Sequence, residues 1–426
     1  MQALFVLLIS GPALAAAPPK VQIVKTASGW QLHRGGAPYF IRGAGVTGFL
    51  DRLPAAGGNS VRTWSVSEDV LKEAAAHGLT VCLGLPIGIP RHGFDYGDPA
   101  QVAAQKQETR ETVLKLKDHP ALLFWALGNE LELNIGDAER IRLWKALNDL
   151  AAMIHELDPN HPVIAVLAGT GKTKLAELKE HCPALDAVGI NAYGGMMKVP
   201  EEVASQGWDK AYIVTEFGPR GYWEVAKTPW GLPIEDTSTE KAAFYLKAYR
   251  HAVENRPNCL GSYVFLWGHK QEKTHTWFNL LFPDGSLTGA VDAITYVWTG
   301  KWPANRAPAI GPLGVRIAAE GSPGDDGRRV FAPGAKLRCQ VDASDPDGDA
   351  LTVAWDLRLD VSDNPSTGGD HEPSTPPIAG AVVSAERAGA LIRLPDKQGN
   401  YRVFVYVRDG KGSIATANVA LAARLQ

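Results

Sequence analysis

The feature that most constrains the fold of this chain is a repeated alternation of short apolar segments with longer amphipathic ones. Eight segments of strand length occur between Phe40 and Trp302, and helix-like segments follow several of them. Such apolar runs are typical of parallel strands that helices cover on both faces. The eight segments are YFIRGAG, NSVRTWSV, LTVCLGLPIG, LLFWALGN, PVIAVLAG, LDAVGINAY, YIVTEFG and GSYVFLWG.

A (β/α)8 barrel and a doubly wound open sheet both produce this alternation, and polar residues at the segment ends decide between them. Polar or aromatic residues end five different segments, at Arg62-Thr63-Trp64, Asn129-Glu130, Asn191-Ala192-Tyr193, Glu216-Phe217-Gly218 and Trp267-Gly268. In a barrel all of these ends meet at one mouth, where active sites are built. The sequence therefore predicts an α/β fold with a (β/α)8 TIM barrel.

Changes in local composition divide the rest of the chain into further parts. Residues 1–17 combine a short apolar run with small residues and predict a signal peptide, which implies export to the periplasm or the extracellular space. We expect the barrel, with an N-terminal hairpin, over 18–303 and a proline-spaced linker over 304–311. Short strands broken by Gly, Pro, Asp and Ser clusters over 312–426 predict a small all-β, immunoglobulin-like sandwich.

Composition excludes two classes of partner. The formal net charge is -3 and no dense run of Lys or Arg occurs, so nothing in the chain would gather the phosphates of a nucleic acid. Hydrophobic residues make up 45% and charged residues 21%, as in packed globular proteins. The apolar run before residue 17 is too short for a lasting anchor, so no stable membrane span is expected.

Two glutamates at segment ends fit the chemistry of glycosidic bond cleavage. One carboxylic acid must protonate the leaving oxygen, and one carboxylate must attack or activate water from the opposite face. Glu130 ends the fourth segment and Glu216 the seventh, so they would face each other across the barrel mouth. Either residue alone fits a structural role equally well, because a carboxylate is also favoured at the start of a helix.

The neighbours of these glutamates favour the catalytic interpretation. Arg62 and Tyr193 could hold a nucleophilic carboxylate ionised and oriented, while Glu130 has no cationic neighbour in sequence and could keep the raised pKa of an acid. Tryptophan faces suit the stacking of sugar rings. Glu132 is a rival carboxylate, for which exposure to solvent or substrate contact is the favoured interpretation. The predicted substrate-binding residues are Arg62, Trp64, Asn129, Asn191, Tyr193 and Trp267.

In this order, the runs GGNSVRTW, WALGNE, INAY, VTEFG and FLWG resemble the barrel of clan A glycoside hydrolases, and family 2 is the most similar in character. The resemblance spans roughly residues 20–303. It implies Glu130 as general acid/base directly after Asn129, Glu216 as nucleophile, and retention of the anomeric configuration. Only a short hairpin precedes the barrel, where family 2 enzymes normally carry jelly-roll and immunoglobulin-like domains, so family 2 specificity is not carried over. Arg62 matches the clan's arginine on strand two, Tyr193 its tyrosine after strand six, and Trp267 its tryptophan on strand eight.

The sequence thus predicts a retaining β-glycoside hydrolase that acts on a β-linked glycan or oligosaccharide, with two alternatives. A transglycosylase would use the same barrel and differ only in the acceptor. A catalytically inactive glycan-binding or adhesion protein would use the same cleft. The chemistry requires no cofactor, but the turn DASDPDGDAL resembles PKD-like and cadherin-like modules, and its Asp345, Asp347 and Asp349 could hold a structural calcium.

Overall fold

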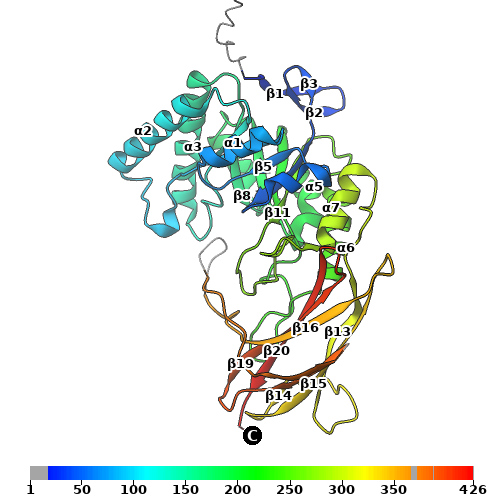
Figure 1. Ribbon diagram of the computed structural model, residues 1–426. Coiled ribbons are helices and arrows are strands. Elements are labelled where there is room, and N and C mark those ends of the chain that lie inside the picture. The colour runs from blue at the N-terminus through cyan, green and yellow to red at the C-terminus, as the bar shows by residue number, and fades with distance from the viewer. Residues whose placement is uncertain (1–17, 366–371, 387, 426) are drawn as a thin grey trace, which may run out of the picture.

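The computed structural model describes residues 18–365, 372–386 and 388–425 of the chain (Figure 1). The predicted signal peptide lies outside these residues. A barrel with surrounding helices forms one half of the molecule, and a β-sandwich forms the other (Figure 1). Among the described residues, no helix has both the length and the apolarity needed to cross a membrane.

The barrel is closed by eight parallel strands, and each coincides with one of the predicted segments. The strand order is β10-β11-β4-β5-β6-β7-β8-β9, which closes on itself. The predicted α/β barrel is therefore confirmed. The strands are β4 (Ile41–Val46), β5 (Ser60–Arg62), β6 (Thr80–Leu85), β7 (Leu122–Leu127), β8 (Val163–Ala168), β9 (Ala187–Asn191), β10 (Ala211–Phe217) and β11 (Cys259–Trp267).

Helices cover the outside of the barrel, and local capping explains where several of them begin. The Ser67 side chain accepts from the Val70 amide at 3.2 Å, and Thr237 and Glu240 form a capping box. The helices are α1 (Glu68–Ala76), α2 (Pro99–Leu116), α3 (Asp137–Leu157), α4 (Lys174–His181), α5 (Val199–Ser205), α6 (Ser238–Ala252) and α7 (Gly289–Thr299). Short 3-10 turns, η1 (Leu50–Arg52) and η2 (Pro54–Ala56), replace a helix between β4 and β5.

A small antiparallel sheet closes the amino-terminal end of the barrel. It consists of β1 (Val21–Thr26), β2 (Gly29–Arg34) and β3 (Ala37–Pro38). The Val21 amide donates to Asn160 O at 2.8 Å and the Trp30 amide donates to Pro257 O at 3.1 Å, and both acceptors lie in segments that enter barrel strands. The open mouth of the barrel is therefore at the opposite, carboxyl end of the strands.

The C-terminal part of the chain forms two facing sheets, as predicted. One has the order β12-β20-β19-β16 with β14 on β20, and the other has the order β13-β15-β18-β17. β13 begins at Ala309, inside the segment predicted as a linker. The strands are β12 (Leu287–Thr288), β13 (Ala309–Ala319), β14 (Val330–Phe331), β15 (Lys336–Ser344), β16 (Thr352–Leu359), β17 (Val382–Glu386), β18 (Gly389–Arg393), β19 (Gly399–Arg408) and β20 (Ser413–Ala423).

The sandwich is attached to loops at the mouth of the barrel. β12 comes from the segment before α7, yet it pairs in parallel with β20 of the sandwich. Asn418 on β20 donates to Glu235 Oε2 at 2.7 Å, and Arg402 on β19 donates to Pro233 O at 3.0 Å. Both acceptors belong to the loop between β10 and α6. The sandwich therefore supports the loops that surround the mouth.

Candidate active site

The two predicted glutamates line one cavity of about 510 Å³ at the carboxyl ends of the barrel strands. Glu216 is the penultimate residue of β10. Glu130 follows β7 with a left-handed φ of 51°, and Gly128 just before it has a φ of 64°. Helix α3 begins only at Asp137, so Glu130 is not the first residue of a helix, and its backbone conformation is one that non-glycine residues rarely adopt. The local strain fits a functional position.

Hydrogen-bond donors surround the Glu216 carboxylate. Arg62 Nη1 and Trp64 Nε1 each donate to Oε1 at 2.7 Å, and the Tyr193 hydroxyl donates to Oε2 at 2.8 Å. Burial raises the pKa of Tyr193 well above its usual value, so this hydroxyl keeps its proton. Because all three partners donate, they fix both oxygens of the Glu216 carboxyl group in orientation.

The environment of Glu130 favours a protonated carboxyl group. Burial, followed by the negative charge of Glu216, raises the pKa of Glu130 to about 7, and Glu132 adds a smaller contribution in the same direction. Asn191 Nδ2 donates to Glu130 Oε1 at 2.9 Å, and Arg91 donates to the Glu130 carbonyl at 2.9 Å. Glu130 can therefore carry a proton near neutral pH, while Glu216 accepts three donors.

The orientation of Asn129 follows from its two donors. Arg62 Nη2 donates to Asn129 Oδ1 at 2.7 Å, and Asn191 Nδ2 donates to the same oxygen at 3.0 Å. Asn191 is itself fixed, because the Thr215 hydroxyl donates to its Oδ1 at 2.9 Å. With its oxygen occupied, Asn129 presents its amide NH2 group to the cavity that it lines, as a donor for a ligand oxygen.

The structure places Trp267 differently from the prediction. Its side chain is 1% exposed, it packs in the barrel core, and its Nε1 donates to Phe49 O at 3.0 Å. Phe265, on the same strand, lines the cavity and contacts Trp64 and Tyr193 edge to face, with ring centroids 5.7 and 5.8 Å apart. The cavity wall that was expected from Trp267 is therefore formed by Phe265.

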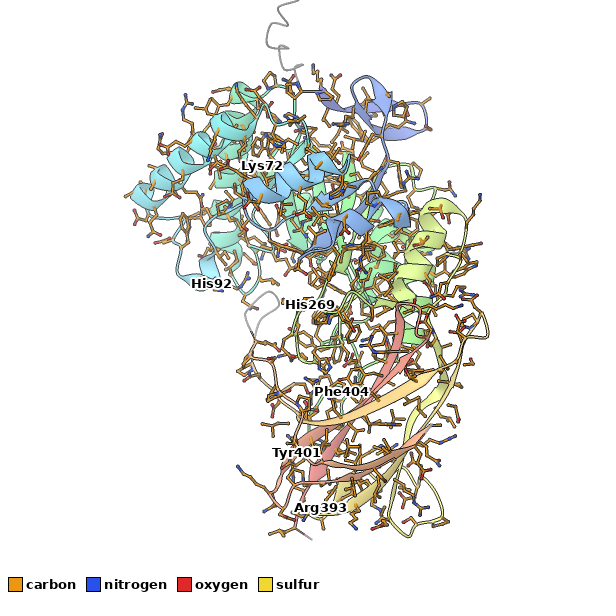
Figure 2. All side chains as sticks on the ribbon, in the orientation of Figure 1. Lys72, His92, His269, Arg393, Tyr401 and Phe404 are labelled. Carbon is orange, nitrogen blue, oxygen red and sulfur yellow. The ribbon has the colours of Figure 1, made fainter. Side chains whose placement is uncertain are left out.

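Charged residues that the sequence analysis had not singled out also line the cavity. Lys270 and Glu272 follow β11 and pair at 2.7 Å, and Arg91 comes from the loop after β6. Burial, followed by a weaker contribution from Glu216, raises the pKa of Glu272, although Lys270 opposes this. Figure 2 shows His92, another lining residue, on the side of the barrel that faces the sandwich. The only signal for these residues in the sequence is that they follow the predicted strands that became β6 and β11.

Glu132 does not face solvent as the sequence favoured. It is 4% exposed, its Oε1 accepts from the Ala168 amide at 2.8 Å and pairs with Lys174 at 2.7 Å, and it does not line the catalytic cavity. The Glu132 carboxylate thus joins the loops after β7 and β8.

The three aspartates of the C-terminal turn lie close together. Asp345, Asp347 and Asp349 each offer a carboxylate oxygen, and these oxygens all lie within 4.8 Å of one another. Lys411 Nζ already pairs with Asp349 Oδ1 at 2.6 Å. Structural calcium at this turn stays a prediction.

Comparison with known proteins agrees with the barrel and its motifs. Residues 70–273 match the family described as glycosyl hydrolases family 2, TIM barrel domain. No curated protein sequence matches the chain.

Three solved structures with the same fold are enzymes of two kinds. The β-D-glucuronidase of Dictyoglomus thermophilum has a TM-score of 0.53 and 17% identity, covering 67% of this chain and 54% of that one. Bacteroides uniformis β-glucuronidase 2, covalently bound to cyclophellitol-6-carboxylate aziridine, has a TM-score of 0.51 and 14% identity, covering 95% and 48%. The family 2 β-galacturonidase of Eisenbergiella tayi, bound to galacturonate, has a TM-score of 0.50 and 15% identity, covering 66% and 54%.

This chain spans about half the length of each of these three proteins. At identities of 14 to 17%, the similarity shows a shared fold and nothing more specific. The family match, the closed barrel and the order of the motifs agree with one another. The barrel of this protein therefore matches the TIM barrel domain of glycosyl hydrolases family 2 over residues 70–273, and a C-terminal β-sandwich follows it.

Proposed function

We propose that this protein is a retaining β-glycoside hydrolase that uses Glu216 as nucleophile and Glu130 as general acid/base. One observation carries the proposal: the Glu130 and Glu216 carboxyl groups line the same cavity at the ends of β7 and β10, where burial and the charge of Glu216 raise the pKa of Glu130 to about 7 and three donors hold Glu216. A protonated acid beside an ionised nucleophile is the starting state of double displacement.

The reaction would proceed in two steps. A Glu216 oxygen attacks the anomeric carbon while Glu130 gives its proton to the glycosidic oxygen, so the carbon–oxygen bond breaks and a glycosyl ester forms on Glu216. The Glu130 carboxylate then takes a proton from water, whose oxygen attacks the same carbon and releases Glu216. The Asn129 amide donates to a hydroxyl of the bound sugar.

A sugar that carries a carboxylate is the glycone class we propose to test first. The side chains of Arg91 and Lys270 line the cavity that contains both glutamates, and they complement a negative charge. The solved structures of the same fold include two β-glucuronidases and a β-galacturonidase.

The first experiment compares 4-nitrophenyl β-D-glycosides of glucuronate, galacturonate, glucose, galactose and mannose. We expect Glu216→Ala to lower kcat/KM for the best of these by at least about 10⁴-fold, because no nucleophile remains. Glu254→Ala, which changes an exposed glutamate just after α6, is the matched control and should leave the rate unchanged.

The second experiment traps the intermediate with the 2-deoxy-2-fluoro derivative of the best glycone. Mass spectrometry of peptides should find the sugar on Glu216. A label on another residue, or a product of inverted configuration by NMR, would contradict the mechanism.

The same assays separate the two alternatives. A transglycosylase would form the same ester on Glu216 but deliver the sugar mainly to a saccharide acceptor. A catalytically inactive binding protein would bind glycans without releasing 4-nitrophenol from any of the glycosides. The raised pKa of Glu130 and the three donors to Glu216 support an active enzyme, because simple binding requires neither.

A further inference from the structure

A second cavity, of about 570 Å³, lies next to the catalytic one. The two cavities share Glu130, Tyr193 and Trp223 as lining residues. Glu216 lines the first cavity and does not line the second. The second cavity is thus in contact with the acid of the proposed pair but not with its nucleophile.

This asymmetry indicates which part of a substrate would occupy the second cavity. In double displacement the nucleophile contacts the anomeric carbon of the glycone, whereas the acid contacts the oxygen of the leaving group. A cavity that only the acid lines therefore lies on the leaving-group side of the scissile bond. The glycone would stay in the first cavity, against Glu216.

The lining of the second cavity fits a saccharide. Trp223 is 52% exposed, and its ring stands edge to face against Tyr193, with centroids 5.3 Å apart, so an aromatic surface is open to a ligand. The Asn134 amide and the Thr170 hydroxyl line the same space. A flat apolar surface beside amides and hydroxyls is the combination that a sugar ring needs, with its apolar face and its ring of hydroxyls.

Two carboxylates that the proposed mechanism does not use, Glu202 and Glu224, give this second cavity a negative charge. Among the described residues, no Lys, Arg or His lines it. Backbone amides hold Glu224 in place, because Gly194 donates to it at 2.7 Å and Gly221 at 2.8 Å. An anionic sugar would face these carboxylates without a cation from the cavity lining to compensate them, and the like charges would repel.

We propose that this second cavity is the leaving-group subsite and binds a saccharide unit that carries no negative charge. The inference rests on the proposed function and makes it more specific. The substrate then has a sugar on both sides of the scissile bond, and acidic sugars are excluded from the leaving-group side.

Transfer to added acceptors tests this subsite, because an acceptor occupies the same place as a leaving group. The acceptor hydroxyl attacks the glycosyl ester on Glu216, its proton passes to the Glu130 carboxylate, and a new glycosidic bond forms as Glu216 leaves. The donor is the β-glycosyl fluoride of the best glycone, since fluoride needs no sugar subsite. The acceptors are methyl α-D-glucopyranoside and methyl α-D-glucuronopyranoside, which differ only in the carboxylate and are not β-glycosides.

In the wild-type protein we expect at least about tenfold more transfer product with the neutral acceptor than with the anionic one. Glu202→Gln removes one charge while keeping an acceptor for the Thr170 hydroxyl, so transfer to the anionic acceptor should rise several-fold. Equal use of the two acceptors by the wild-type protein would overturn the proposal.

A substitution at Gly195 tests the location of the subsite. Gly195 lines only the second cavity, and a Cβ there would meet Glu224 Oε1 at an ordinary 3.7 Å. Gly195→Leu should fill the space and lower transfer to the neutral acceptor, relative to fluoride release by the same variant, by at least about tenfold. Gly195→Ala, the matched control, adds much less volume and should lower this ratio far less.

The outcomes separate the two levels of inference. If Gly195→Leu transfers as wild type does, the subsite is elsewhere, although the proposed hydrolase stands. If the wild-type protein releases no fluoride from any β-glycosyl fluoride, the proposed function fails and the subsite fails with it. If Gly195→Leu does not fold, as judged by its melting temperature, the acceptor comparison and Glu202→Gln still decide the proposal.

Discussion

At the scale of single residues, the proposed chemistry depends on the proton of Glu130. Burial and the charge of Glu216 raise the pKa of this carboxyl group to about 7, so its protonated fraction falls as the pH rises through that value. We expect kcat/KM for a glycoside with a poor leaving group to fall about tenfold per pH unit above about 7. Steady-state kinetics between pH 4 and 9 measure this.

The contribution of Glu216 to that pKa can be tested separately. Glu216→Gln removes the neighbouring negative charge, so the pKa of Glu130 should fall toward its usual value. Titration of the Glu130 carboxyl group by NMR or infrared difference spectroscopy reports this directly. An unchanged pKa would mean that burial alone protonates Glu130.

Phe265 and Trp267 should respond differently to substitution. Phe265→Ala removes a wall of the catalytic cavity, and we expect KM to rise about tenfold or more. Trp267→Phe removes the hydrogen bond to Phe49 O and part of a buried side chain, so it should lower the free energy of unfolding by about 1 to 3 kcal/mol with little change in KM. Chemical denaturation and steady-state kinetics on both variants compare the two effects. A larger KM effect at Trp267 than at Phe265 would restore the original assignment.

At the scale of elements, a buried ion pair joins the loop after β10 to helix α6. Glu235 Oε1 and Lys241 Nζ lie 2.5 Å apart, with side-chain exposures of 1% and 8%. Burial alone would raise the pKa of Glu235, but the Lys241 and Arg402 cations outweigh it, so the pKa is lowered. The stabilisation from a depressed carboxyl pKa is present above the unfolded value of about 4.3 and is lost as the pH falls through the folded value.

Glu235→Gln should therefore lower the free energy of unfolding at pH 7 by about 3 to 5 kcal/mol, because Lys241 is left buried without a counter-charge. The dependence of stability on acid pH should also become shallower. Urea unfolding at pH 7 and pH 4 measures both effects. The matched control is Glu320→Gln, which breaks an exposed pair with Lys336 and should cost less than about 1 kcal/mol.

At the scale of the whole molecule, strand pairing and hydrogen bonds join the sandwich to the barrel. β12 pairs with β20, Asn418 binds Glu235, and Arg402 binds Pro233. A chain ending at residue 303 would leave Glu235 buried with fewer donors and would expose the loops around the mouth. We expect this truncated chain to be aggregated or unfolded, and the full chain to melt in one transition by calorimetry. A truncated barrel with wild-type kcat/KM would show that the sandwich is an independent module.

The sequence by itself determined the barrel, because the alternation of apolar strand segments with amphipathic helical segments is a local pattern. Each of the eight apolar segments carries its own signal for a buried strand, and parallel strands with covering helices have few ways to close. The same reasoning brought Glu130, Glu216, Arg62 and Tyr193 to one mouth, since chain position at a strand end determines which edge of the barrel a residue reaches.

Only the tertiary structure decided which side chains lie next to the residues at the strand ends. The choice between Phe265 and Trp267 depends on packing across strands, and the burial of Glu132 depends on Lys174, which lies 42 residues further along the chain. The charges from the loops after β6 and β11, the second cavity and the support from the sandwich all arise from segments far apart in sequence. Such contacts leave no periodic signal, because they depend on side-chain positions that exist only once the chain has folded.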